Sequence, residues 1–121
     1  MSTLRVNTLQ NAAGTGQPAM SGAAKAWVNF NGTGTVAIRA SFNVTSITDV
    51  TTGTYNVNFT TALEDANYAV NGSCGRDANN GYDFLTIEGT SNMTTSSVRI
   101  ATRIVSQNPL DQAVVCVSIF R

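Results

Sequence analysis

Among the patterns in the sequence, the spacing of oxygen-bearing side chains in the second half of the chain most resembles the ligand pattern of a metal-binding site. Oxygen ligands stand at positions 1, 3, 7 and 12 of a calcium-loop spacing: Asp77, Asn79, Asp83 and Glu88. Position 6 holds Tyr82 instead of glycine, and the residues after it alternate as a strand does. A strand would hold Asp83 and Glu88 about 16 Å apart, too far to share one ion. We therefore predict a plain loop, with no metal and no cofactor.

Nucleophilic and general acid–base chemistry lack their usual residues. The chain has no histidine, which removes the commonest general base and both the Ser-His and Cys-His pairs. Glu64 and Asp65 are adjacent, so on a strand or turn they point apart and do not form a hydrolytic pair. Cys74 and Cys116 occur in dissimilar sequence contexts, so a disulfide between them is possible but not required. We expect both thiols to be reduced. The sequence predicts a protein that is not an enzyme.

Binding chemistry is better represented, in one polar loop. Tyr82 is the aromatic residue that we expect to be exposed; aromatic faces stack on sugars, and its polar neighbours supply donors and acceptors. The candidate binding residues are Arg76, Asp77, Asn79, Asn80 and Tyr82. The other aromatic residues are expected elsewhere. Tyr55 and Tyr68 share the parity of core positions, whereas Trp27 takes the face opposite to its apolar neighbours and is expected to pack between subunits.

The amino-acid composition narrows the classes of molecule that this protein is expected to bind. The 121 residues carry 7 Lys+Arg and 7 Asp+Glu, so the net charge is zero and the basic excess typical of nucleic-acid binding is missing. No apolar stretch approaches the roughly 18 residues of a membrane span, and the first residues lack a secretion-type apolar region. We expect no nucleic acid, no membrane insertion and synthesis in the cytoplasm.

Two segments are expected along the chain. Residues 1–22 contain three large aliphatic residues, Leu4, Val6 and Leu9, followed by a low-information stretch, and so little apolar surface cannot offset the cost of ordering the backbone. We predict an extended arm and linker there, and a folded domain over 23–121. Short β-branched and aromatic runs then alternate with turn signals, at 25–29, 35–44, 47–50, 54–60, 67–73, 83–88, 95–105 and 113–120. This pattern predicts an all-β fold, a small antiparallel β-sandwich of seven or eight strands.

Three runs carry more detailed predictions. Run 35–44 has nearly perfect period 2, which places five residues on one buried face: Val36, Ile38, Ala40, Phe42 and Val44. In run 83–88 the apolar residues occupy both parities, which predicts a strand covered on both sides or a β-bulge. Run 113–120 is apolar on both faces and is expected to be a central strand.

Several segments together resemble the C-terminal domain of phage tail-fibre proteins, especially from marine and cyanobacterial phages. The segments are 24–39, 41–44, 47–49, 53–60, 65–68 and 115–121, and residues 2–10 resemble the N-terminal virion-attachment segment of the same group. The resemblance covers nearly the whole chain. It implies a virion component that forms a homotrimer, with Leu4, Val6 and Leu9 in the segment held by the particle. The β domain would face host-surface receptors, either glycan or protein.

The linker of this chain is shorter than in that group, and this difference leaves other functions open. Relatives usually carry a longer shaft between the two parts, whereas this linker has only about a dozen residues. The chain is therefore also compatible with a tail-tip piece or with a capsid decoration or head-fibre protein that binds no receptor. A stand-alone carbohydrate-binding module is the alternative from a different class.

Overall fold

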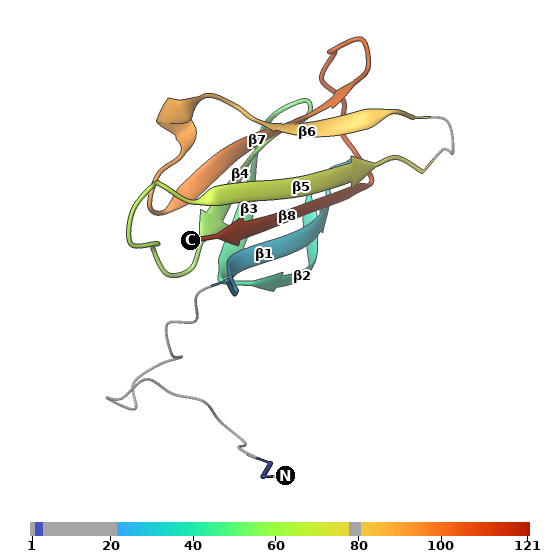
Figure 1. Ribbon diagram of the computed structural model, residues 1–121. Coiled ribbons are helices and arrows are strands. Elements are labelled where there is room, and N and C mark those ends of the chain that lie inside the picture. Colours follow the sequence, from blue (N-terminus) through green and yellow to red (C-terminus); the bar gives the residue numbers. More distant parts are fainter. Residues whose placement is uncertain (1, 4–21, 78–80) are drawn as a thin grey trace.

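The structure, a computed structural model, describes residues 2–3, 22–77 and 81–121. Eight antiparallel strands form two four-stranded sheets: sheet A in the order β2-β1-β8-β5 and sheet B in the order β3-β4-β7-β6 (Figure 1). The strands are β1 (Ala24–Asn31), β2 (Ala37–Phe42), β3 (Val44–Thr51), β4 (Thr54–Phe59), β5 (Ala69–Gly75), β6 (Asp83–Ile87), β7 (Ser97–Ile104) and β8 (Val114–Phe120). A single 3-10 turn, η1 (Thr90–Asn92), precedes β7. The predicted antiparallel β-sandwich is confirmed. Over the described ranges, no helix is long and apolar enough to cross a membrane.

The inward faces of both sheets form one apolar core. Tyr55 and Tyr68 are buried, as their parity predicted. Their rings meet Phe30 and Phe59 edge-on, with centroids 5.2 and 5.8 Å apart, the geometry that the aromatic quadrupole favours. Trp27 lies on the other face of β1 and is 40% exposed, again as expected. The period-2 pattern therefore positions most of the core.

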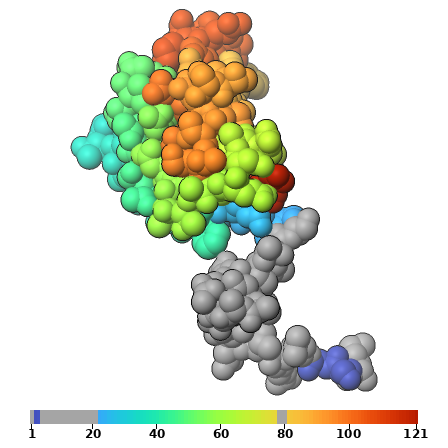
Figure 2. Space-filling model, turned by 90° about the vertical axis from the view of Figure 1, so that its left-hand side faces the viewer, coloured from blue at the N-terminus to red at the C-terminus, as the bar shows by residue number. Residues whose placement is uncertain are grey.

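The antiparallel topology gives the sandwich two distinct ends. We call the end where β1 begins the proximal end; it also carries residues 60–68 and 88–96 (Figure 2). Asn43, which precedes β3, and Arg121, which follows β8, lie at the same end. The opposite end, the distal end, carries the connections 32–36, 52–53, 76–82 and 105–113. Every strand runs between these two ends. The chain thus enters the domain at the end opposite to the loop with the candidate binding residues.

The predicted buried face of run 35–44 is wrong at Ala40 and Phe42, whereas Val44 is buried as predicted. Ile38 pairs with an inward residue of β1, but Ala40 pairs with the outward-facing Asn29, so the register shifts by one residue at Arg39. This β-bulge reverses the parity of the later residues of β2. Ala40 and Phe42 consequently face outward, and Phe42 is 41% exposed.

Asn43 ends β2 and redirects the chain into the other sheet. Its φ of 54° is left-handed, a region that asparagine tolerates better than most residues. Its side-chain amide donates to the carbonyl oxygens of Lys25 and Thr61, each at 3.1 Å, and its Oδ1 accepts the Thr61 N–H at 2.7 Å. This corner places β3 in sheet B, where Val44 is buried at its start.

The remaining strand predictions have mixed outcomes. Strand β8 lies between β1 and β5, so the prediction of a central strand is confirmed. The prediction for 83–88 is wrong, because β6 is an edge strand without a register shift, and its Phe84 and Ile87 are 38% and 40% exposed. Cys116 faces outward and pairs in register with Ser73, so its neighbour Cys74 faces inward. Both thiols are free, and their opposite directions preclude a bridge between them.

Candidate functional site

The candidate site lies at the distal end, where the loop after β5 meets the start of β6. Arg76 and Asp83 form a bidentate ion pair, in which Nε donates to Oδ2 at 2.7 Å and Nη2 donates to Oδ1 at 2.5 Å. The Asp83 side chain is only 2% exposed, whereas that of Arg76 is 30% exposed. A Cβ on Gly81 would lie 2.5 Å from Arg76 Nε and 2.8 Å from Asp83 Oδ2. A larger residue at position 81 would therefore have to displace the Arg76 and Asp83 side chains from their present positions.

The Arg76–Asp83 pair predicts a stability that is lost in acid. Its hydrogen bonds lower the pKa of the Asp83 carboxyl below its ordinary value of about 3.9. A depressed folded-state pKa stabilises the protein above the unfolded value, and this contribution disappears as pH falls through about 4 towards the folded value. We expect Asp83→Asn to lower the Tm at pH 7 and to change it little near pH 2. Scanning calorimetry across this range tests the pair, and a pH-independent difference would contradict it.

The predicted binding residues are not equivalent in the structure. Tyr82 is 84% exposed and Asp77 is exposed, so both are available to a ligand. Arg76 has its guanidinium committed to Asp83, and it organises the loop more than it offers a free cation. Asn79 and Asn80 lie outside the described residues, as do Leu4, Val6 and Leu9 of the predicted arm.

The carboxylates of the calcium-like spacing are engaged elsewhere. Asp83 pairs with Arg76, whereas Glu88 pairs with Arg103 of β7 at 3.1 Å. The extended strand β6 separates the two carboxylates. In the described part of the chain, no group of three or more His, Cys, Asp or Glu side chains is placed to hold a metal ion.

A second cluster beneath the distal loops was not anticipated from the sequence. The hydroxyl of Tyr55 lies 2.8 Å from Asp111 Oδ1 and 3.0 Å from the Gly32 carbonyl oxygen, and the same carboxylate oxygen accepts the Gly53 N–H at 2.7 Å. Burial first, and then the Asp111 carboxylate, raise the pKa of Tyr55 well above its ordinary value, so the phenol stays protonated as a donor. Three of the four distal connections are thereby tied to one core side chain.

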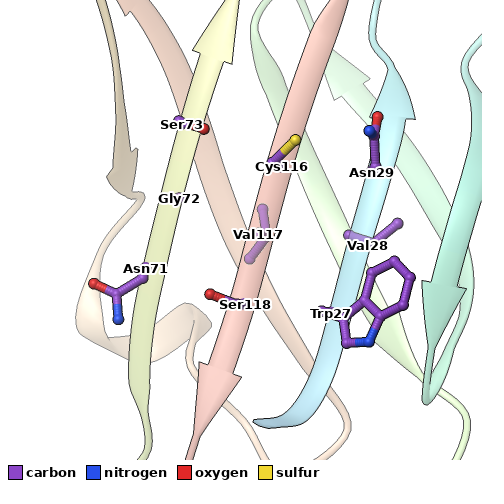
Figure 3. Close-up of a pocket in the computed structure, with 9 residues that line it drawn as sticks. All are labelled: Trp27, Val28, Asn29, Asn71, Gly72, Ser73, Cys116, Val117 and Ser118. Carbon is purple, nitrogen blue, oxygen red and sulfur yellow. The ribbon is translucent and has the colours of Figure 1, made fainter.

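The outer face of sheet A carries a shallow groove, which Figure 3 shows from outside. Its space of about 420 Å³ crosses three neighbouring strands, β1, β8 and β5. The indole of Trp27 lies on the side of β2, Asn71 lies on the far side, and the small residues of β8 lie between them (Figure 3). The groove is lined by Trp27, Val28, Asn29, Asn71, Gly72, Ser73, Cys116, Val117 and Ser118. Apart from Trp27, the sequence reasoning missed these residues, although strand parity would have placed the outward ones together.

Comparison with known proteins adds no relative. Neither the protein-family models, nor the curated proteins, nor the solved structures contain a match to this chain. A function is therefore inferred from the geometry above and from the sequence resemblance.

Proposed function

We propose that this protein is a non-enzymatic structural component of a phage virion, a short homotrimeric tail fibre or tail-tip piece. The N-terminal segment with Leu4, Val6 and Leu9 docks onto other virion proteins. The β-sandwich displays its distal end to a glycan or protein on the host surface. Tyr82 and Asp77 make the contact, together with Asn79 and Asn80, which lie between them in the sequence, and Arg76 pairs with Asp83 at the base of the loop.

One observation carries this proposal: β1 begins at one end of the sandwich, and Arg76, Asp77 and Tyr82 of the candidate binding loop lie at the other. An attached particle at the proximal end would leave the distal loops unobstructed. The pairing of Arg76 with Asp83 and the anchoring of neighbouring loops by Tyr55 pre-organise that end, which lowers the entropy cost of binding.

The location of the chain in purified virions tests the proposal. We expect electron cryo-microscopy to find the domain at the tail, with its proximal end towards the particle. Density on the head would instead assign a decoration or head-fibre role, and would overturn the host-attachment part. A virion without the chain would overturn the whole proposal.

Tyr82→Ala is expected to weaken attachment to host cells at least about tenfold, because exposed aromatic residues that become buried on binding are typical hot spots. Thr61→Ala is the control, since Thr61 is exposed at the proximal end. Binding of purified protein to host cells, measured by flow cytometry, compares the two variants. Equal binding by both would remove Tyr82 from the contact surface.

The groove on sheet A favours a second candidate function, a stand-alone carbohydrate-binding module. Its exposed indole and its uncharged amide and hydroxyl groups suit a neutral sugar. A glycan array separates the candidates. Hits that require Trp27 support the module, whereas hits that require Tyr82 support attachment through the distal end.

A further inference from the structure

We infer that the buried side-chain amide of Gln112 binds an ordered water molecule, which bridges it to the Asp83 carboxylate and ties the base of the candidate binding loop to the core. Gln112 lies in the connection 105–113, just before β8. The bound species is a small neutral hydroxyl group that both donates and accepts hydrogen bonds. The inference deepens the proposed function, and it rests on that function only for the role of the loop in attachment.

The side chain of Gln112 is buried without a protein partner. It is 0% exposed, and among the described residues neither its Nε2 nor its Oε1 has a hydrogen-bond partner. An amide offers two N–H donors and a carbonyl acceptor, and each buried group that is left unpaired lowers the stability of the fold. Buried water characteristically bonds to polar groups that lack a partner within the protein. The Gln112 amide therefore has the properties of a water-binding site.

The backbone around Gln112 is held by hydrogen bonds on both sides. The carbonyl oxygen of Gln112 accepts the Gly32 N–H at 2.9 Å. The preceding residue, Asp111, is fixed through its carboxylate, as described above. The carbonyl oxygen of the following residue, Ala113, accepts a bond from the Arg39 guanidinium at 2.7 Å. The segment is thus fixed, which leaves the amide little freedom to find a protein partner elsewhere.

The strand register brings Gln112 close to the ion pair at the base of the loop. Strands β5 and β8 pair Gly75 with Val114, so Gln112 lies beside the residues that follow Gly75. The first of these, Arg76, pairs with Asp83 and contributes most to lowering the pKa of that carboxyl, and the Gln112 amide adds a smaller decrease. The amide is therefore near the carboxylate, yet no direct hydrogen bond joins them. Polar groups in this relation are typically joined by a bridging water.

The balance of charge at this place favours water over an ion. The Asp83 side chain is 2% exposed, and both of its oxygens accept donors from Arg76. The guanidinium neutralises the carboxylate, and the amide is uncharged, so an ion would add an unbalanced charge to a buried site. A carboxylate keeps acceptor capacity beyond two bonds. Water can therefore accept from Gln112 Nε2 and donate to Asp83, while a neighbouring water donates to Oε1.

The bridge completes the set of contacts that joins the distal connections to one another. The Tyr55 hydroxyl and its partners already join three of the four. The fourth connection, 76–82, is the candidate binding loop, and the Arg76–Asp83 pair lies at its base. Water between Gln112 and Asp83 links this pair to the other three connections. Gln112 is thus a positioning residue, and it helps to pre-organise the loop for binding.

A crystal structure of the full chain, at a resolution that orders water molecules, tests the bridge. We expect a water oxygen within about 2.7–3.2 Å of both Gln112 Nε2 and an Asp83 carboxylate oxygen. Gln112→Met replaces the amide by an apolar side chain of similar length, and we expect it to fold and to lose the water. Gln112→Leu is a second variant in case the first does not fold. A direct bond from Nε2 to a protein group, without water, would overturn the inference.

Titration of the Asp83 carboxyl provides a readout that a merely structural role would not move. In the fold Asp83 lies near the Arg76 guanidinium, the Gln112 amide and the Cys74 thiol. Removing the amide and its water takes donors away from the ionised carboxylate, so we expect its pKa to rise in Gln112→Met. Gln107→Met, exposed on the same connection, is the matched control and should leave the pKa unchanged. NMR measures the titration midpoint, and an equal midpoint in both variants would contradict the bridge.

Failure of this inference is distinguishable from failure of the proposed function. The water and the titration midpoint are measured on purified protein, without virions or host cells. In the flow-cytometry assay described for Tyr82→Ala, we expect Gln112→Met to bind host cells less than Gln107→Met does. Equal binding by these two variants, with the water lost from the first, would overturn the positioning role of Gln112. Attachment through Tyr82 would remain in place in that case.

Discussion

Removal of residues 1–20 is expected to abolish incorporation of the protein into particles while leaving the β domain folded. Among the residues that the structure describes, the buried core runs from Ala26 to Ile119, and on this basis we expect the domain to fold without residues 1–20. The segment removed contains Leu4, Val6 and Leu9, the apolar residues that we assign to docking. Quantitative mass spectrometry of purified virions measures incorporation, and thermal unfolding of the purified domain measures folding.

Point variants test whether docking needs the apolar side chains of the segment or only its length. We expect a full-length Leu4→Asp/Val6→Asp/Leu9→Asp protein to be excluded from particles as completely as the deletion. Thr8→Asp, in the same segment, places one charge beside them and should still be incorporated. If the truncated protein still assembles onto particles, attachment through this segment is wrong.

Strand parity predicts the architecture because an antiparallel sandwich buries alternate residues. Tyr55 and Tyr68 are buried and Trp27 is exposed for this reason. The same rule fails at Arg39, where one extra residue in the ladder turns Ala40 and Phe42 outward. No local pattern marks that bulge, because its register is set by pairing with β1.

The site is predictable only in its local part. The exposed loop at Tyr82 is predicted by its polar neighbours and turn signal. The Asp111 carboxylate binds Tyr55 and Gly53, which lie 56 and 58 positions before it in the chain, and such pairs arise only when the fold closes. The outward face of sheet A likewise combines strands from both ends of the sequence. The features that the sequence does not predict are therefore those that bring together residues far apart in the chain, whatever the types of those residues.

Gly53→Ala is expected to destabilise the protein by roughly 3 kcal/mol or more, the largest effect we expect from a single added methyl group. Gly53 has φ +68°, where a side chain costs about 1–2 kcal/mol. Its added Cβ would also lie 2.6 Å from the Thr102 carbonyl oxygen and 2.7 Å from the Leu110 nitrogen. These are backbone atoms, and they are hydrogen-bonded to each other at 3.1 Å, so neither yields cheaply.

Gly34→Ala is the matched control, because Gly34 has a similar φ of +58° but no atom within 4 Å of its added Cβ. Both variants pay the cost of a side chain in left-handed backbone. The difference between their free energies of unfolding therefore measures the cost of the contact between the added Cβ at position 53 and the backbone of Thr102 and Leu110. Urea denaturation measures it, and equal losses would contradict the contact. Displacing the 52–53 turn also moves Asp111, which accepts the Gly53 N–H and orients Tyr55. We therefore expect Gly53→Ala, but not Gly34→Ala, to weaken host attachment along with stability.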